Sequence, residues 1–242
     1  MFKVVKNDFM RNFFSPYIWC CIISVCALHY LNVLAESSSG ITPDYEEFVF
    51  YLDGGFSVVD WIICVIGGGI GFCDEMKSGY FKFNLARIDK SSYCFSKVLN
   101  AAISSFLCAF MGLELFHGIY YVFCLCTQHS LEIQQITLSK VCSYHAMIFG
   151  IALLCGILSM FGLIVTMIIQ DTFVSMTLPV LGLYLYMYAS TIFGFPDFLA
   201  PSRVFYYTTP WGRLYSVFVT LWVGIGCYVF MKKKMSRRLE HE

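Results

Sequence analysis

Glu114 and His117 are the most distinctive chemical groups in this sequence, because they lie three positions apart near the middle of a long apolar stretch. Side chains at this spacing point to the same side of a helix. An ionisable group inside a membrane-spanning helix is energetically costly, so it usually faces the protein interior or a water-filled cavity. The pair therefore indicates either a polar contact in a transport pathway or dimer interface, or a hydrogen-bonded pair that ties helices together.

Asp60 is a third ionisable residue in apolar surroundings, but it lies near the end of its expected helix, where anchoring is favoured over function. The sequence also holds 12 Cys and 11 Met, the residue types that bind soft metals. Most fall inside apolar stretches, where thiols and thioethers act as adaptable packing groups. Cys124 and Cys126 could bind a metal or another thiol, although packing is favoured there too. We therefore expect no metal or other cofactor in this chain.

Motifs of the common hydrolases are absent from the sequence. No Gly is followed by Lys, so the chain has no phosphate-binding loop of the Walker A type. It also lacks the HExxH and GxSxG patterns of zinc proteases and α/β-hydrolases. We expect a chain that is not an enzyme and that does not hydrolyse ATP by itself.

The strongest functional signal is the charged segment Asp74–Lys97. If a short helix starts at Gly79, helical spacing places three apolar side chains on one face: Phe81, Leu85 and Ile88. Three polar side chains lie on the neighbouring face: Tyr80, Asn84 and Arg87. Such an element could contact another protein, but periodicity alone favours a solvated loop whose charges follow the positive-inside rule.

The composition predicts the scaffold that must hold these residues. Of the 242 residues, 58% are hydrophobic and only 13% are charged, against about 25% charged in an average soluble domain. A membrane crossing needs about 20 mostly apolar residues. We therefore expect an all-α integral membrane protein with six transmembrane helices. Their approximate bounds are 17–35, 56–73, 98–126, 141–169, 172–195 and 214–231.

Several shorter features complete this single transmembrane domain, which we expect over residues 1–238. Residues 1–15 place apolar side chains on one helical face and charged side chains largely on the other, as an interfacial helix does. Pro16 ends or kinks this helix. The glycine cluster in the second span would let another helix approach closely. Residues 196–211, rich in Pro, Tyr and Trp, are typical of a re-entrant segment at the membrane interface. The last four residues, Leu239–Glu242, could be a cloning remnant.

The distribution of Lys and Arg predicts the orientation. With six spans and a cytoplasmic N-terminus, the cytoplasmic side holds thirteen basic residues: Lys3, Lys6, Arg11, Lys77, Lys82, Arg87, Lys90, Lys97, Lys232, Lys233, Lys234, Arg237 and Arg238. The other side holds three: Lys140, Arg203 and Arg213. This asymmetry favours a multi-pass protein of the plasma membrane with both termini in the cytoplasm.

The segment Asp74–Lys97 also resembles the loop after the second span of ABC-2 type permeases. In that family an acidic residue and a Gly precede a short helix, and a basic residue, a Ser or Arg, a Tyr and a Lys lead into the third span. The matching residues here are Glu75, Gly79, Leu85, Arg87, Ser91, Tyr93 and Lys97. The interfacial helix, the six spans and the re-entrant segment are also similar, so the resemblance covers nearly the whole chain.

The resemblance implies that the cytoplasmic coupling helix docks on a separate ATPase subunit, which would hold ATP and Mg. The residues expected to take part are Glu75, Gly79, Phe81, Leu85, Arg87, Ile88, Tyr93 and Lys97. It also implies an exporter of a hydrophobic or amphipathic solute, such as a peptide, a lipid-linked compound or a drug. Two permease chains, as a homodimer or with a sibling chain, would form the pathway.

Two other functions stay open at this point. The first is an ion-coupled carrier or channel that uses Glu114, His117 and Asp60 as a relay. Such carriers more often show matched broken helices or internal repeats, and none is convincing here. The second is a membrane immunity or sensor protein that binds a peptide without pumping it. The formal net charge of zero gives no reason to expect a nucleic-acid partner.

Overall fold

The computed structural model describes residues 2–37, 57–126, 138–196, 199–200 and 210–240, and the regular secondary structure in these ranges is entirely helical. The helices are α1 (Phe2–Phe13), α2 (Pro16–Ser37), α4 (Val58–Lys77), α5 (Tyr80–Arg87), α6 (Lys90–Cys126), α8 (Leu138–Ile169), α9 (Thr172–Ile192) and α11 (Pro210–Glu240). The prediction of an all-α architecture is confirmed for these residues.

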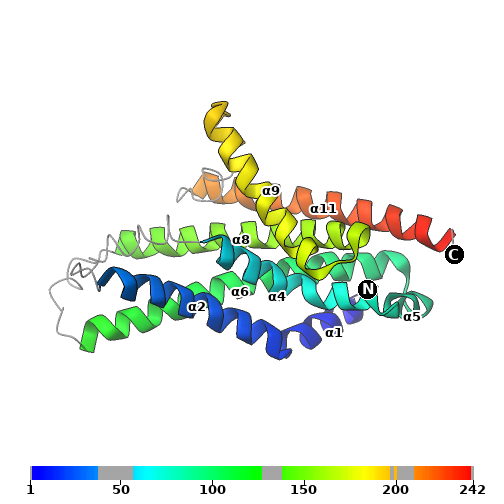
Figure 1. The fold of residues 1–242 in the computed structure, drawn as a ribbon, viewed down its shortest axis with the longest axis horizontal. Coiled ribbons are helices and arrows are strands. Elements are labelled where there is room, and N and C mark those ends of the chain that lie inside the picture. The colour runs from blue at the N-terminus through cyan, green and yellow to red at the C-terminus, as the bar shows by residue number, and fades with distance from the viewer. Residues whose placement is uncertain (1, 38–56, 127–137, 197–198, 201–209, 241–242) are drawn as a thin grey trace.

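The long helices form a bundle around α8 (Figure 1). Helices α4, α6 and α11 pack against α8, and α2 packs against α4 and α6. The apolar stretch of α8 is 72% buried, against 28% for α9 and 17% for α11. α9 crosses the bundle obliquely, while α1, α5 and the last turns of α11 lie together at one end (Figure 1). We call this the α5 end of the bundle.

Several helices are suited to a membrane. Among the described residues, four are long and apolar enough to cross, and a fifth crossing results if the bent pair α1–α2 counts as one span. α4 falls short of this standard because Asp60 lies near its start, and Asp74, Glu75 and Lys77 lie near its end. The chain is therefore a multi-pass all-α membrane protein in its general character.

The largest difference from the predicted boundaries is in the third span. α6 begins at Lys90 rather than near Val98, because residues 90–97 continue the helix without a break. Glu114 is therefore 24 residues, or about 36 Å at 1.5 Å per residue, from the start of the helix. Glu114 and His117 therefore lie beyond the midpoint of the helix itself, while their depth in the membrane stays a prediction. They lie toward the end of α6 that is remote from α5.

Two sharp changes of direction agree with the predictions. α1 ends at Phe13 and α2 begins at Pro16, with a bend of 54° between them. Pro suits the first position of a helix, because its fixed φ is helical and its missing N–H is not needed there. α8 and α9 form the predicted tight hairpin, in which Asp171 caps α9 by accepting a hydrogen bond of 2.9 Å from the Val174 amide.

The glycine cluster of α4 is where the bundle is packed most closely. A Cβ atom built on Gly68 would lie 2.5 Å from the Ala101 carbonyl oxygen of α6, and it would also collide with the hydroxyls of Ser105 and Ser159. Three helices, α4, α6 and α8, therefore meet at this point with no room for a side chain. This arrangement confirms the prediction that the cluster allows close helix approach.

Some predictions lie outside what the structure describes. The proposed re-entrant segment falls largely on residues 197–198 and 201–209, and the side chains of Cys124 and Cys126 are also outside the described part.

Candidate functional site

The α5 end of the bundle is organised around the buried carboxylate of Glu75 on α4. Its Oε1 accepts hydrogen bonds from the Arg11 guanidinium at 2.5 Å and from Lys97 Nζ at 2.9 Å. Its Oε2 accepts one from the Tyr93 hydroxyl at 2.9 Å and a longer one from Asn84 Nδ2 at 3.5 Å. One carboxylate thus connects α1, α4, α5 and α6.

A second carboxylate, Asp8 on α1, extends this network. Its Oδ2 lies 3.2 Å from Lys97 Nζ and accepts a hydrogen bond of 2.7 Å from the Ser96 hydroxyl. Arg11 lies 3.6 Å from Asp8 Oδ1, so two cations face two carboxylates and the cluster is formally neutral. Buried charges are tolerated when they are paired and hydrogen-bonded in this way. We call these residues, together with Tyr93 and Asn84, the Glu75 network.

α5 is positioned by the hydrogen bond of Asn84 to the network and by apolar packing on the core. α5 begins directly after Gly79, as predicted, and Gly79 has φ = 72°, a conformation that side chains other than Gly rarely adopt. Phe81 is only 4% exposed, and Leu85 and Ile88 pack partly against the same core. The three apolar residues therefore share one face, as predicted. That face is turned toward this chain's own core rather than outward, where α5 packs on α4 and α6.

The outer face of α5 carries a different set of side chains. Phe83 is 67% exposed, and its ring lies 6.1 Å from that of the exposed Tyr80. Lys82 and Arg87 are also exposed. A two-ring aromatic patch beside basic groups is the part of α5 that another protein could contact, and we call it the outer α5 face.

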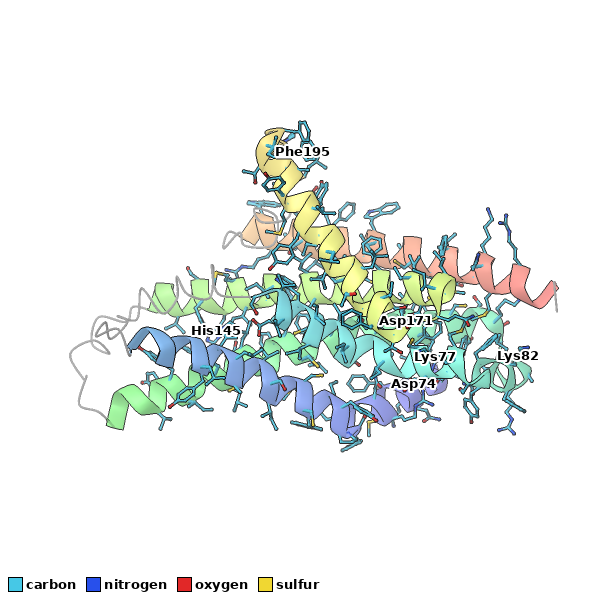
Figure 2. The ribbon with its side chains drawn as sticks, viewed as in Figure 1. Asp74, Lys77, Lys82, His145, Asp171 and Phe195 are labelled. Carbon is cyan, nitrogen blue, oxygen red and sulfur yellow. The ribbon has the colours of Figure 1, made fainter. Side chains whose placement is uncertain are left out.

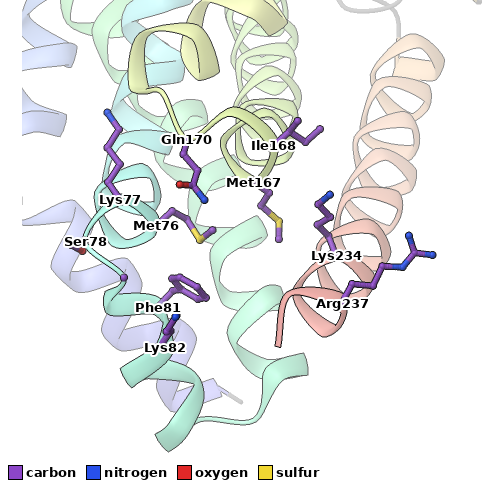
Figure 3. A pocket seen from close by; sticks show the side chains of 11 residues that line it. Met76, Lys77, Ser78, Phe81, Lys82, Met167, Ile168, Gln170, Lys234 and Arg237 are labelled. Carbon is purple, nitrogen blue, oxygen red and sulfur yellow. The ribbon is translucent and has the colours of Figure 1, made fainter. Parts of the chain in front are cut away.

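A pocket of about 720 Å³ opens beside α5, between the ends of α4, α8 and α11 (Figure 3). Its ionisable lining residues are all basic: Lys77, Lys82, Lys234 and Arg237. Figure 3 shows that these come from both sides of the pocket, with Met76, Phe81 and Met167 between them. A concave surface lined by one sign of charge attracts groups of the opposite sign. We call it the basic pocket.

The start of α6 is tied to α11 on the other side of this end. The hydroxyls of Ser91 and Tyr228 form a short hydrogen bond, and Lys90 Nζ donates to the Ser236 hydroxyl at 3.2 Å. The start of α6 is therefore connected to α1 and α4 through the Glu75 network and to α11 through these two contacts.

The other predicted residues, Glu114, His117 and Asp60, lie away from the α5 end. Figure 2 shows this for His145, the partner of Glu114, which lies far from Lys77 and Lys82. Glu114 Oε1 forms a hydrogen bond of 2.7 Å with Nδ1 of His145, which lies on α8. Asp60 sits at the start of α4, where its Oδ2 accepts hydrogen bonds from the Ser57 amide at 2.9 Å and hydroxyl at 2.7 Å. The same oxygen lies 3.9 Å from His29 Nε2 of α2.

The structure thus separates the predicted site residues into groups. Glu75, Tyr93 and Lys97 lie together in the Glu75 network, whereas Arg87 lies on the outer α5 face. Sequence reasoning missed several partners of these groups: Asp8, Arg11, Asn84, Ser96 and His145. A signal was present for Asp8 and Arg11, whose spacing of three places both on one face of α1. The partners on other helices could not be found without the packing.

Compared with known proteins, the chain matches no protein-family model, no curated protein and no solved structure.

Proposed function

We propose that this chain is the membrane-spanning permease subunit of an ATP-driven exporter of the ABC-2 type, with six crossings and both termini in the cytoplasm. The observation that carries the proposal is the way α5 is attached to the long helices. A short helix that begins directly after Gly79 is linked through Asn84 to the Glu75 network, which joins α1, α4 and α6, and it lies next to the basic pocket.

This attachment of α5 is suited to transmitting a conformational change from a soluble subunit to the membrane helices. A coupling element must be stiff, must present a contact surface, and must be connected to more than one span. α5 meets the first need through its buried Phe81, and the second through Phe83 and Tyr80 on the outer α5 face. The Glu75 network meets the third. The basic pocket would receive acidic groups of the partner, which steer association and fix its orientation.

Six crossings require α4 to span the membrane despite its charged ends. Those charges lie at the two ends of the helix, and most are paired: Asp60 forms part of the cap of α4, and Glu75 belongs to its network. The uncharged residues between them, 61–73, cover about 20 Å at 1.5 Å per residue. α4 is surrounded by α2, α6, α8 and α9, so its ends need not meet lipid.

The apolar surface of the bundle is suited to contact with a hydrophobic or amphipathic solute and with a second permease chain. α9 and α11 expose large apolar side chains, including Phe173, Leu185, Tyr188, Phe218 and Trp222. An almost wholly apolar groove of about 430 Å³ lies between α8, α9 and α11. We propose that a hydrophobic or amphipathic solute is moved along such surfaces in a dimer of permease chains.

The proposal is tested by reconstitution with an ATP-binding subunit encoded in a neighbouring gene. The chain alone should show no ATP turnover, because its sequence has no Gly-Lys pair for a phosphate-binding loop. The co-expressed subunit should co-purify with the chain, and its ATP turnover should change when the chain is present in vesicles. Failure of the two proteins to associate, or ATP turnover by the chain alone, would show that the proposal is wrong.

A further inference from the structure

Three potential metal ligands from two helices lie together at the end of the bundle remote from α5. Glu114 and His117 come from α6 and His145 comes from α8, and one ligand atom of each lies within 4.8 Å of the others. The hydrogen bond between Glu114 Oε1 and His145 Nδ1 holds two of them together. We propose that these three side chains form a binding site for a divalent transition-metal ion of the Zn²⁺ class.

The donor set selects this class of ion. Two imidazoles and one carboxylate suit Zn²⁺ and its neighbours, whereas Ca²⁺ and Mg²⁺ prefer sites made of oxygen atoms alone. Ligand atoms of a tetrahedral Zn²⁺ site lie about 2.0–2.2 Å from the ion, and so roughly 3.4 Å from each other. Rotation of the side chains of Glu114, His117 and His145 over a small distance would bring their ligand atoms to that separation.

The surroundings hold the ligands without closing the site. The ring of Tyr144 packs on that of His117 with centroids 4.3 Å apart, and the rings of His117 and His145 are perpendicular at 5.7 Å. The side chains of His145 and Glu114 are 44% and 25% exposed. Three protein ligands with partial exposure leave a fourth position for water or for a donor atom of another molecule.

The three ligands lie far along the bundle from the α5 end. Glu114 is 24 residues from the start of α6, and His145 is 24 residues from the end of α8 at Ile169, so each lies about 36 Å along its helix from the α5 end. The ligands therefore lie toward the end of the bundle opposite α5, and the partial exposure of His145 and Glu114 gives an ion access to them. This inference does not depend on the proposed function.

The simpler alternative is that Glu114 and His145 form only a hydrogen bond that ties α6 to α8. The two interpretations differ in what His117 does, because the hydrogen bond does not need His117 whereas the metal site does. They also differ for Glu114→Gln, because a glutamine can keep the hydrogen bond to His145 but is a much poorer metal ligand than a carboxylate.

The experiment is a Zn²⁺ titration, by calorimetry, of the full chain in detergent, purified with a tag that contains no histidine. We expect one saturable equivalent of Zn²⁺ per chain. His117→Ala, His145→Ala and Glu114→Gln should each weaken Zn²⁺ binding by at least about tenfold. Changing a residue that only supports a metal ligand already weakens metal affinity by about that factor, and changing a ligand should cost at least as much. Co²⁺ bound to the parent chain should give the visible absorption of a tetrahedral site, a readout that needs no variant.

Two controls test thiols as the true ligands. Cys142→Ser removes an exposed thiol three residues before His145, and a Cys124→Ser/Cys126→Ser variant removes the pair noted in the sequence. Both should bind Zn²⁺ as the parent does. The proposal is overturned if the parent shows no saturable equivalent, if the His117 and Glu114 variants bind normally while eluting as the parent does in size exclusion, or if either thiol variant abolishes binding.

Discussion

The Lys97 ammonium lies 2.9 Å from the Glu75 carboxylate, so an ion pair between α6 and α4 is buried beside the helix that we propose as the coupling element. Lys97 also reaches Asp8 of α1 at 3.2 Å. A buried charge in this position depends on its protein partners, because burial removes the water that would otherwise solvate it. The pair therefore makes the packing of α1, α4 and α6 depend on two side chains.

Breaking this pair should destabilise the bundle. Glu75→Gln removes the carboxylate that Lys97 and Arg11 share. Loss of one partner of a buried pair costs up to about 3–5 kcal/mol, and the cost is smaller here because Lys97 keeps Asp8 at 3.2 Å. Asp74→Asn is the matched control, because Asp74 is the preceding residue and is exposed. Thermal unfolding in detergent should show a clear drop for Glu75→Gln and little change for Asp74→Asn. Equal unfolding temperatures for the two variants would show that the pair does not stabilise the bundle.

Close packing at Gly68 gives a second prediction. A Cβ at this position would collide with Ala101, Ser105 and Ser159 on two helices, so Gly68→Ala must push α4 away from its neighbours. Overpacking of this kind typically costs about 1–3 kcal/mol. Gly226→Ala on α11 is the control, since its Cβ would meet nothing within 4 Å. We expect a lower unfolding temperature for the first variant only, and the prediction is wrong if both behave as the parent does.

The orientation in the membrane gives a third prediction. In a background without reactive thiols, cysteines placed at Ser38, Ser130 and Ser202 should react with an impermeant reagent from outside the cell. A cysteine at Ser78, at the α5 end, should react only after the cells are opened. The reason is the excess of Lys and Arg on one side of the six-span topology. Labelling of Ser78 in intact cells, or protection of the other three positions, would contradict this topology.

Much of the scaffold could be predicted from the sequence, because it depends on local properties. Apolar stretches, Pro16 and the Gln170-Asp171 pair determine where helices run and turn, and the structure has them at those places. The start of α6 was missed because residues 90–97 are polar enough to be taken for a loop. Their polar groups are instead paired within the bundle, as Lys97 and Ser96 show.

The candidate sites were predictable only in part. The resemblance to ABC-2 type permeases implies Glu75, Tyr93 and Lys97 as coupling residues, and the structure brings these three side chains together, while their role in coupling stays a prediction. Helical spacing placed Phe81 on an apolar face. Which way that face turns depends on how α5 packs against α4 and α6, and periodicity along one helix contains no such information. His145 was missed for the same reason, because it meets Glu114 across two helices that are distant in sequence.

The final prediction concerns the outer α5 face, where Phe83 should be the main contact with the ATP-binding subunit. An exposed aromatic side chain next to basic groups is a typical centre of a protein interface, and truncation of such a residue often costs about 2 kcal/mol or more. Phe83→Ala should therefore weaken the Kd for the subunit by roughly 30-fold. Arg87→Glu should mainly slow association and change its dependence on salt, because charges near an interface act through steering.

The matched control is Phe193→Ala at the end of α9. Phe193 is 73% exposed against 67% for Phe83, and Figure 1 shows the end of α9 well away from α5. The control removes the same ring from the surface but far from α5, so it should leave the Kd for the subunit unchanged. Neither Phe83 nor Phe193 is buried, so each variant should fold and insert as the parent chain does. If Phe83→Ala binds the subunit as tightly as Phe193→Ala and supports export as well as the parent chain does, the outer α5 face is not the coupling surface.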